Sequence, residues 1–296
     1  MKKSTNEVLI SKKYAKRGPI AEFWHHMKRN KGAVVGMFII ALFILIMLYS
    51  FFFISFEQVT RMNALNSMAP PSRNHPFGTD DMGRDIFLRA LYGSRYSLAV
   101  GFGAIAFSLI AGTFLGSIAG YIGGYPEEII MRVTDIISSI PTLLLGMVIV
   151  TVLGQNLRNL IFAIGVTTVP PFVRISRASV LTVKGNEFVE SAQAIGMSKI
   201  RIIFTQVVPN GLSPIIVITT SIIGTAILQA ASLSFLGFGI PVPTPEWGSM
   251  VSSGRAYLRM APHIAFFPGI FIMVIVLACN LFGDGLRDAL DPKLKR

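Results

Sequence analysis

The chain has 296 residues, of which 52% are hydrophobic and only 14% are charged, and its mean hydropathy is +0.61. A soluble domain has about a quarter of its residues charged, so most of this protein's surface is expected to face lipid. The net charge of +12 comes from Lys and Arg at the ends of long apolar runs. This pattern is typical of membrane flanks and argues against a nucleic-acid-binding protein.

The first 31 residues are polar and basic and predict a cytoplasmic N-terminal tail. The uncharged run over 32–56 is too long for the apolar core of a cleavable signal peptide. We therefore expect residues 32–56 to form an uncleaved first transmembrane helix.

Five further apolar runs can each cross a bilayer, because a helix spans the ~30 Å hydrocarbon layer in about 20 residues. The fourth run is interrupted by Pro170 and Pro171 and carries Arg174 and Arg177 in its last turns. These arginines are expected to reach water at the membrane surface. The predicted fold is an all-α polytopic membrane protein with six transmembrane helices, at 32–56, 97–121, 136–157, 159–180, 212–236 and 264–283.

Lys and Arg gather in three regions that six crossings place on one side of the membrane. The positive-inside rule makes this side cytoplasmic, so both termini are expected in the cytoplasm. A C-terminal tail is then predicted over 285–296 and an external loop over 57–96. The three basic regions are the N-terminal tail, then Arg174, Arg177, Lys184, Lys199 and Arg201, and finally Lys293, Lys295 and Arg296.

The external loop is predicted to contain a short helix that lies along the membrane surface and leads into the second crossing. Thr79 or Asp80 can cap this helix, which would begin near Asp81. Asp85 and Arg89 stand four residues apart in the order that favours an ion pair on a helix.

The second crossing carries a stripe of small residues at every fourth position, namely Ala104, Ser108, Gly112, Gly116 and Gly120. On a helix these residues form one smooth face, which allows a second helix to approach closely in lipid. Two interpretations remain open: packing inside this subunit, or a sliding surface that faces another subunit.

The segment over 185–210 predicts a short cytoplasmic helix between the fourth and fifth crossings. Gly185 breaks the preceding helix, Asn186 is a good N-cap, and Gly196 suits the position after the helix end. Glu187 and Glu190 favour its first turn through the helix dipole. The helix also has an apolar side, formed by Phe188, Ala192 and Ile195.

This apolar side has no obvious place to pack within its own subunit. The helix could lie against the membrane, or it could enter a groove on a soluble partner protein. A helix of this length is marginal in water, so it needs one of these surfaces.

The same segment resembles the EAA loop of bacterial ATP-binding cassette (ABC) importer permeases. That motif reads Glu-Ala-Ala, three residues, Gly, nine residues, Ile, one residue, Leu-Pro. Its spacing fits from Glu190 through Gly196 to Pro209. The departures are small: Ser191 stands in place of Ala, Gln206 in place of Ile and Val208 in place of Leu.

Longer stretches narrow the resemblance to the dipeptide/oligopeptide/nickel permease group, in its shorter, second-permease branch. The resemblance covers about residues 72–292. The stretches that carry it are 75–85 (HPFGTDDMGRD), 231–237 (ASLSFLG), 243–248 (PTPEWG) and 280–292 (NLFGDGLRDALDP).

The resemblance implies the fold of type I ABC importer permeases, with a core permease domain over 97–284. It also implies a heterodimer with a second, homologous permease subunit, two ATPase subunits, and an extracytoplasmic binding protein in a bacterial cell membrane. ATP and Mg would be used by the ATPases, and this chain would hold no cofactor or metal. The residues expected to contact an ATPase are Glu187, Phe188, Glu190, Ser191, Ala192, Ile195, Gly196 and Pro209, with support from Asp284, Arg287 and Asp288.

The chain has no Gly-x4-Gly-Lys-Ser/Thr phosphate loop, so it is expected to be a transport subunit and not an enzyme. Asp135 lies near the start of the third crossing, where it can pair with Arg132 in a structural role. Trp247 and the tyrosines at the ends of the crossings, such as Tyr121, are expected to anchor the membrane interface.

The favoured function is import of short peptides, with nickel or a metal chelate as the alternative cargo. A secondary transporter would need acidic or histidine side chains deep in its helices, and a membrane enzyme would need a converging catalytic set. The sequence shows neither feature.

Overall fold

The computed structural model describes residues 24 and 27–290, and within them the chain is helical apart from loops and one isolated bridge between Thr79 and Asp85. The predicted N-terminal tail therefore lies mostly outside the described residues, as do Lys293, Lys295 and Arg296. The main helices are α3 (Lys31–Phe53), α4 (Phe56–Thr60), α5 (Ile86–Ile122), α6 (Gly124–Ser139), α7 (Thr142–Leu153), α8 (Leu157–Lys184), α9 (Glu187–Ala194), α10 (Lys199–Ile202), α11 (Val208–Asn210), α12 (Leu212–Phe235), α13 (Trp247–Gly254) and α14 (His263–Leu290). Short 3-10 helices cover Ala64–Asn66 and Arg255–Tyr257, and a π-helical segment covers Ile203–Val207.

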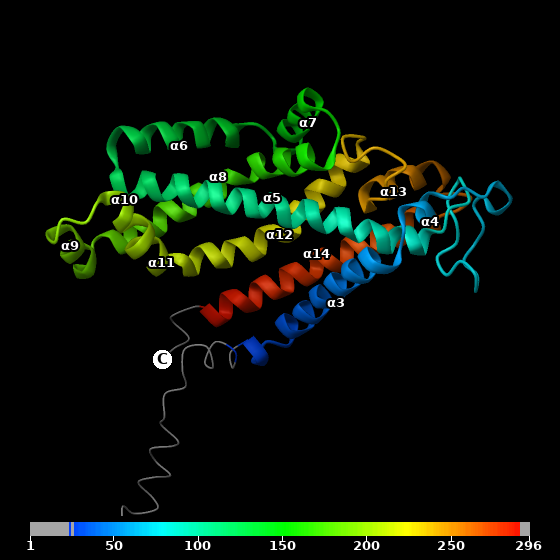
Figure 1. Ribbon diagram of the computed structural model, residues 1–296, viewed down its shortest axis with the longest axis horizontal. Helices are drawn as coiled ribbons and strands as arrows, with labels where there is room; N and C mark the ends of the chain where they lie inside the picture. The colour runs from blue at the N-terminus through cyan, green and yellow to red at the C-terminus, as the bar shows by residue number, and fades with distance from the viewer. Residues whose placement is uncertain (1–23, 25–26, 291–296) are drawn as a thin grey trace, which may run out of the picture.

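These helices form an elongated bundle, with α9 and α10 at one end and α4 and α13 at the other (Figure 1). Among the described residues, the helices long and apolar enough to cross a membrane are α3, α5, α8, α12 and α14. The pair α6 and α7 supplies a sixth crossing if it counts as one span. The predicted all-α membrane fold is therefore confirmed.

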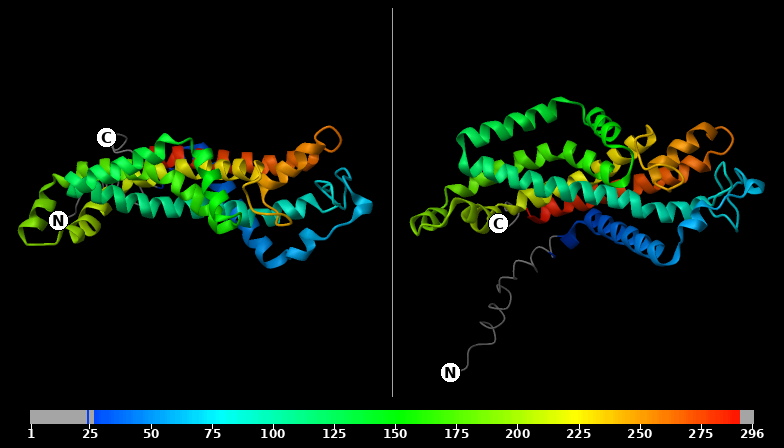
Figure 2. Two further views of the ribbon diagram at one scale, coloured as in Figure 1. Left: turned by 90° about the horizontal axis from the view of Figure 1, so that it is seen from above. Right: turned by 45° about the horizontal axis from the view of Figure 1, so that its top comes forward.

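The third crossing differs from the straight helix predicted over 136–157. The chain is bent by 95° between α6 and α7, and α6 runs back along the bundle (Figures 1 and 2). Ile140 has an extended backbone (φ −94°, ψ 131°) directly before Pro141. A residue before proline avoids the helical region, so the helix ends there and restarts in a new direction.

The fourth crossing is continuous, because α8 passes through Pro170 and Pro171 and ends at Lys184. Transmembrane helices tolerate proline when neighbouring groups satisfy the freed backbone. The prediction that the two arginines near its end simply reach water is corrected, because each of them pairs with an acidic residue of α6. Arg174 pairs with Asp135 of α6 at 2.9 Å, and Arg177 Nε donates to Glu127 of α6 at 2.6 Å.

The separate interfacial helix predicted near Asp81 is wrong, because α5 runs unbroken for 37 residues from Ile86. Asp85 is its N-cap, accepting from the Leu88 amide at 2.8 Å, and it also lies 2.7 Å from His75 Nδ1. Its carboxylate is thus engaged at the helix start, and the predicted Asp85–Arg89 pair does not form.

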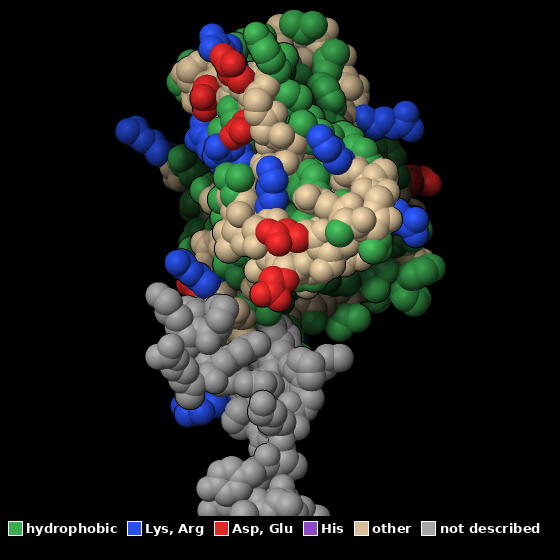
Figure 3. Space-filling model, turned by 90° about the vertical axis from the view of Figure 1, so that its left-hand side faces the viewer, with side chains coloured by type: hydrophobic (Ala, Val, Ile, Leu, Met, Phe, Trp, Pro, Cys, Tyr) green, Lys and Arg blue, Asp and Glu red, His purple; other side chains and the backbone are tan. Residues whose placement is uncertain are grey.

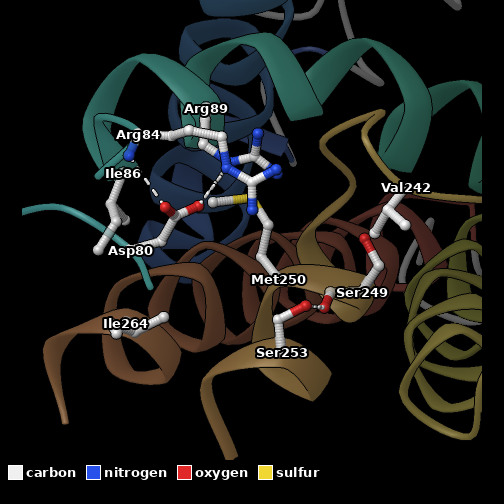
Figure 4. A pocket seen from close by; sticks show the side chains of 9 residues that line it. All are labelled: Asp80, Arg84, Ile86, Arg89, Val242, Ser249, Met250, Ser253 and Ile264. Carbon is white, nitrogen blue, oxygen red and sulfur yellow. Dashed lines mark hydrogen bonds and ion pairs between the residues drawn. The ribbon is translucent and has the colours of Figure 1, made fainter. Parts of the chain in front are cut away.

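Arg89 instead joins a buried ion-pair cluster with Asp80 and Arg84, which Figure 4 shows from close by. Asp80 Oδ2 lies 2.7 Å from Arg84 Nε and 3.5 Å from Arg89 Nε. Arg89 also donates to the carbonyl oxygen of Val59 at 2.8 Å. The cluster therefore connects the loop over 60–85, the end of α4 and the start of α5.

The predicted i, i+3 pair of Arg132 with Asp135 is also wrong. Arg132 pairs with Glu128 at 2.7 Å, which leaves Asp135 for Arg174 on α8.

Trp247 is fully buried and does not anchor an interface. Its ring packs edge-on against Phe43 of α3 and Phe271 of α14, and Nε1 donates to the Ala90 carbonyl oxygen at 2.8 Å. This side chain therefore connects α3, α5, α13 and α14 at the centre of one hydrophobic cluster.

The helix α3 lies against α14, the last helix. A Cβ added at Gly36 would lie 2.5 Å from the Ala278 carbonyl oxygen, so the two backbones are in close contact. Asn30 caps α3 by accepting from the Ala33 amide, and its Nδ2 donates to Asp288 at 3.0 Å. The first and last described helices are thus joined along their length.

Candidate coupling site

The short helix expected between the fourth and fifth crossings is α9, at one end of the bundle (Figure 1). It begins after Asn186, which has an extended backbone, although the Asn186 side chain makes no capping hydrogen bond. Beyond its end, Gly196 has φ +78°, a left-handed conformation that glycine adopts without steric cost. The helix therefore begins and ends where the spacing predicts.

The inner side of α9 packs on the rest of the chain. Val189 is fully buried and Ala192 is 6% exposed. The prediction that the apolar side has no place in its own subunit is therefore wrong for Ala192, and Val189 was missed. Together with residues of α5, α8 and the segment after α9 they form what we name the α9 cluster: Tyr121, Val180, Val183, Val189, Ala192, Ile202, Ile203 and Val207.

The outer side of α9 remains uncovered. Ile195, just after the helix, is 78% exposed and Phe188 is 40% exposed, although both are large and apolar. Glu187, Glu190 and Ser191 are exposed beside them. Figure 3, which views this end of the molecule, shows acidic, basic and hydrophobic side chains mixed on one surface. The α9 cluster thus holds the helix in place while its outer side is free to meet another surface.

Hydrogen bonds link α9 and α8 to the end of α5 at Tyr121. The Tyr121 hydroxyl accepts a hydrogen bond from Gln193 Nε2 of α9 at 3.0 Å. The Tyr121 carbonyl oxygen accepts from Lys184 Nζ, at the end of α8, at 2.6 Å. The ammonium group also lies 5.4 Å from the centre of the Tyr121 ring.

The remaining residues predicted for the coupling site lie apart from α9. Pro209 is exposed in α11, just before α12. Asp284, Arg287 and Asp288 are exposed in the last turns of α14, which continues to Leu290 through part of the predicted tail. That end of α14 lies beside the start of α3, where Asp288 contacts Asn30 (Figure 1).

The small-residue stripe of the second crossing faces α8 of the same chain. A Cβ added at Gly112 would lie 2.4 Å from Phe172 Cβ, and one at Gly120 would lie 2.8 Å from the Arg177 carbonyl oxygen. Ala104 is fully buried, and Ser108 Oγ lies 2.7 Å from the Gly165 carbonyl oxygen. Of the two interpretations of this stripe, the geometry therefore supports packing of α5 on α8 inside the subunit.

Sequence reasoning gave Gln193 no role, and it was wrong for Tyr121, because this tyrosine at the end of a crossing is buried and does not anchor an interface. The signal that could have identified Tyr121 is the pair Gly123–Gly124, which follows it at the end of an apolar run. Both glycines have positive φ (73° and 60°), so they reverse the chain between α5 and α6.

Comparison with protein families gives two matches along the chain. Residues 112–296 match the model of the binding-protein-dependent transport system inner membrane component. Residues 18–71 match the N-terminal transmembrane domain of oligopeptide transport permease C. The chain therefore belongs to the family of binding-protein-dependent transport system inner membrane components, the permeases of ABC importers, and the predicted family is confirmed.

Curated relatives resemble the chain over nearly its whole length. It is 47% identical to the dipeptide transport system permease protein DppC of Alkalihalophilus pseudofirmus, over 95% of this chain and 92% of that protein. It is 42% identical to DppC of Haemophilus influenzae, over 96% and 98% of the two chains. It is 41% identical to the glutathione transport system permease protein GsiD of Escherichia coli, over 94% and 92%.

Solved structures show the same fold at low sequence identity. The inward-facing MetNI methionine ABC transporter matches with a TM-score of 0.56 and 17% identity, over 70% of this chain and 98% of that chain. An amino acid ABC transporter matches with a TM-score of 0.51 and 14% identity, over 67% and 92%. The chain is thus a multi-pass permease of the bacterial inner membrane.

Proposed function

We propose that this permease imports short peptides, driven by ATP hydrolysis in separate subunits that dock on α9. The relatives that carry the names dipeptide and glutathione permease cover more than nine-tenths of the chain at 41–47% identity. Glutathione is itself a tripeptide, so the three relatives share one chemical class of cargo.

The ATPase contact is proposed because one side of α9 is buried in the protein and the other side is exposed. Its inner residues Val189 and Ala192 are buried, whereas Phe188 and Ile195 present apolar surface to water. A short helix that lays an apolar face into a groove is a recurring mode of protein recognition. The contact residues proposed for the ATPase are the exposed ones, namely Glu187, Phe188, Glu190, Ser191, Ile195, Gly196 and Pro209, with Asp284, Arg287 and Asp288 in support. Ala192 is withdrawn from this set because it is buried in the α9 cluster.

We place the α9 end in the cytoplasm, together with both termini. Lys28, Arg29 and Lys31 lie at the start of α3, and Lys184, Lys199 and Arg201 lie on either side of α9, which is the pattern that the positive-inside rule expects of a cytoplasmic end.

The opposite end then faces an extracytoplasmic binding protein. No lysine occurs between Lys31 and Lys184 or between Lys199 and Lys293, so the positive charge of this end is carried by arginine. Arginine and methionine are enriched in protein interfaces, and lysine is depleted. The exposed arginines and methionines at the α4 and α13 end are Arg61, Met62, Arg73, Met82, Arg255, Arg259 and Met260, and the exposed Leu65 lies among them. A second permease subunit would complete the pathway.

The proposal is tested by reconstituting the permease with ATPases, a second permease and a binding protein of this family from the same organism. We expect a ligand screen of the binding protein to select short peptides, and uptake of a labelled dipeptide into vesicles to require both ATP and the binding protein. Uptake driven by an ion gradient without ATP would refute the importer assignment. Selective uptake of nickel, with no uptake of dipeptides, would refute the cargo.

A further inference from the structure

The end of α5 is attached to α9 at one buried side chain. Tyr121 is 4% exposed and is the last residue but one of α5. Its ring belongs to the α9 cluster, which contains Val189 and Ala192 of α9 itself. Contact with this ring therefore keeps the inner side of α9 against α5.

The Tyr121 hydroxyl adds a directional link to this apolar contact. Gln193 Nε2 donates to it at 3.0 Å, and within residues 24 and 27–290 this is the one side-chain hydrogen bond that joins α9 to another helix. Lys184 Nζ of α8 donates to the backbone carbonyl oxygen of Tyr121 at 2.6 Å. Tyr121 is thus fixed to α8 through its backbone and to α9 through its hydroxyl.

The end of α5 that carries Tyr121 leads directly into α6. The reversal at Gly123 and Gly124 begins two residues later, and α6 follows it without a break. Further along α6, the Glu127–Arg177 and Asp135–Arg174 pairs hold it to α8. Because α6 is paired with α8 at these two points and Lys184 of α8 donates to Tyr121, the helices α5, α6 and α8 are connected around the α5–α6 reversal.

We propose that Tyr121 is the positioning residue that connects α9 to the α5–α6 reversal, so that displacement of α9 by its partner moves α5 and α6 with it. This inference rests on the proposed docking of an ATPase on α9. The hydroxyl provides the link that keeps the two helices in register, and the ring provides the buried contact around it.

The first test removes the hydroxyl and keeps the ring, with Tyr121→Phe in the complete assembly reconstituted in vesicles. The loss of one hydrogen bond is expected to raise the number of ATP molecules hydrolysed per labelled dipeptide imported by about two- to tenfold. Gln193→Ala should have the same effect, and the double variant should add little to either change, because both remove the same bond. Tyr125→Phe is the matched control, since Tyr125 lies four residues away and is 82% exposed.

The ratio of ATP hydrolysed to dipeptide imported distinguishes a residue that links α9 to α5 from one that only stabilises the fold. If Tyr121 only stabilised the fold, Tyr121→Phe would lower the amount of assembled complex and leave ATP hydrolysed per dipeptide unchanged. That result would overturn the inference.

A second measurement needs no cargo and therefore separates this inference from the proposed function. Spin labels are placed in the assembly at Ala194→Cys of α9 and Ile129→Cys of α6, both exposed, while the native Cys279 is buried. We expect a narrow distance distribution that Tyr121→Phe broadens and Tyr125→Phe does not. A distribution that stays narrow in Tyr121→Phe would overturn the inference, whereas absence of dipeptide uptake by the unmodified assembly would count against the peptide cargo alone.

Discussion

Replacement of Gly116 by alanine tests the close packing of α5 on α8. A Cβ at this position would lie 2.4 Å from the Val173 carbonyl oxygen and 2.8 Å from Ser176 Cβ. One of these atoms belongs to the backbone of α8 and cannot rotate away. The two helices must therefore separate by several tenths of an ångström over the surrounding turns.

The cost follows from two opposing effects. Overpacking of a well-packed contact destabilises by about 1–3 kcal/mol. Alanine in place of glycine inside a helix stabilises by roughly 0.5–1 kcal/mol. We expect Gly116→Ala to lower the free energy of unfolding by about 1–2 kcal/mol, because the steric effect is the larger.

The assay is unfolding of the purified permease in mixed micelles by increasing sodium dodecyl sulfate, followed by helical circular dichroism. Gly269→Ala is the matched control, because Gly269 lies inside α14 and a Cβ there meets no atom within 4 Å. Gly269→Ala should leave stability unchanged or raise it, so the two variants should shift in opposite directions. If Gly116→Ala were as stable as Gly269→Ala, α5 and α8 would not be in backbone contact at this point.

Three further predictions concern other parts of the chain. Gly196→Asp, at φ +78°, should leave membrane insertion intact but uncouple ATP hydrolysis from uptake. Gly185→Asp, at φ −84°, should keep hydrolysis and uptake coupled, and equal uptake by both variants would contradict the role of Gly196. Asp80→Asn leaves the buried Arg84 and Arg89 without their carboxylate and should lower the free energy of unfolding by about 3–5 kcal/mol. Arg132→Met removes an exposed ion pair and is the control; an equally small change in both variants would show that the buried cluster contributes little. Burial raises the pKa of Glu246, so the folded protein binds a proton more readily than the unfolded chain, and stability should fall as pH rises from the ordinary carboxyl pKa through the folded one. Glu246→Gln should remove this fall in unfolding experiments across pH; an unchanged pH profile would assign it to other groups.

The crossings that the sequence predicts well are those that lipid alone determines. The predicted range 212–236 corresponds to α12 within a residue, and 264–283 lies inside α14. A bilayer demands an uncharged run of fixed length and satisfied backbone groups, so the run itself locates the helix. The small residues of α5 likewise indicated close helix packing, although their period could not say which helix they meet.

The errors come from partners that are distant in the sequence. Local spacing suggested the pairs Asp85–Arg89 and Arg132–Asp135, but Asp135 pairs with Arg174, 39 residues away. Trp247 similarly finds its contacts on three other helices. Local spacing favours pairs by only a few tenths of a kcal/mol, roughly 0.2–0.5, which tertiary contacts exceed. For α9, the inner position of Val189 depends on a cluster drawn from α5 and α8, which helical periodicity alone does not reveal.

The contact of α3 with α14 has a consequence for how the protein is made. A ribosome releases α3 into the bilayer first, yet the surface that fits Gly36 is on the last helix to be synthesised. During translation the side of α3 that carries Gly36 therefore stays uncovered until α14 has been synthesised. A chain truncated before α14 keeps the contacts of α3 with α5 but leaves the side of α3 that carries Gly36 without its neighbour.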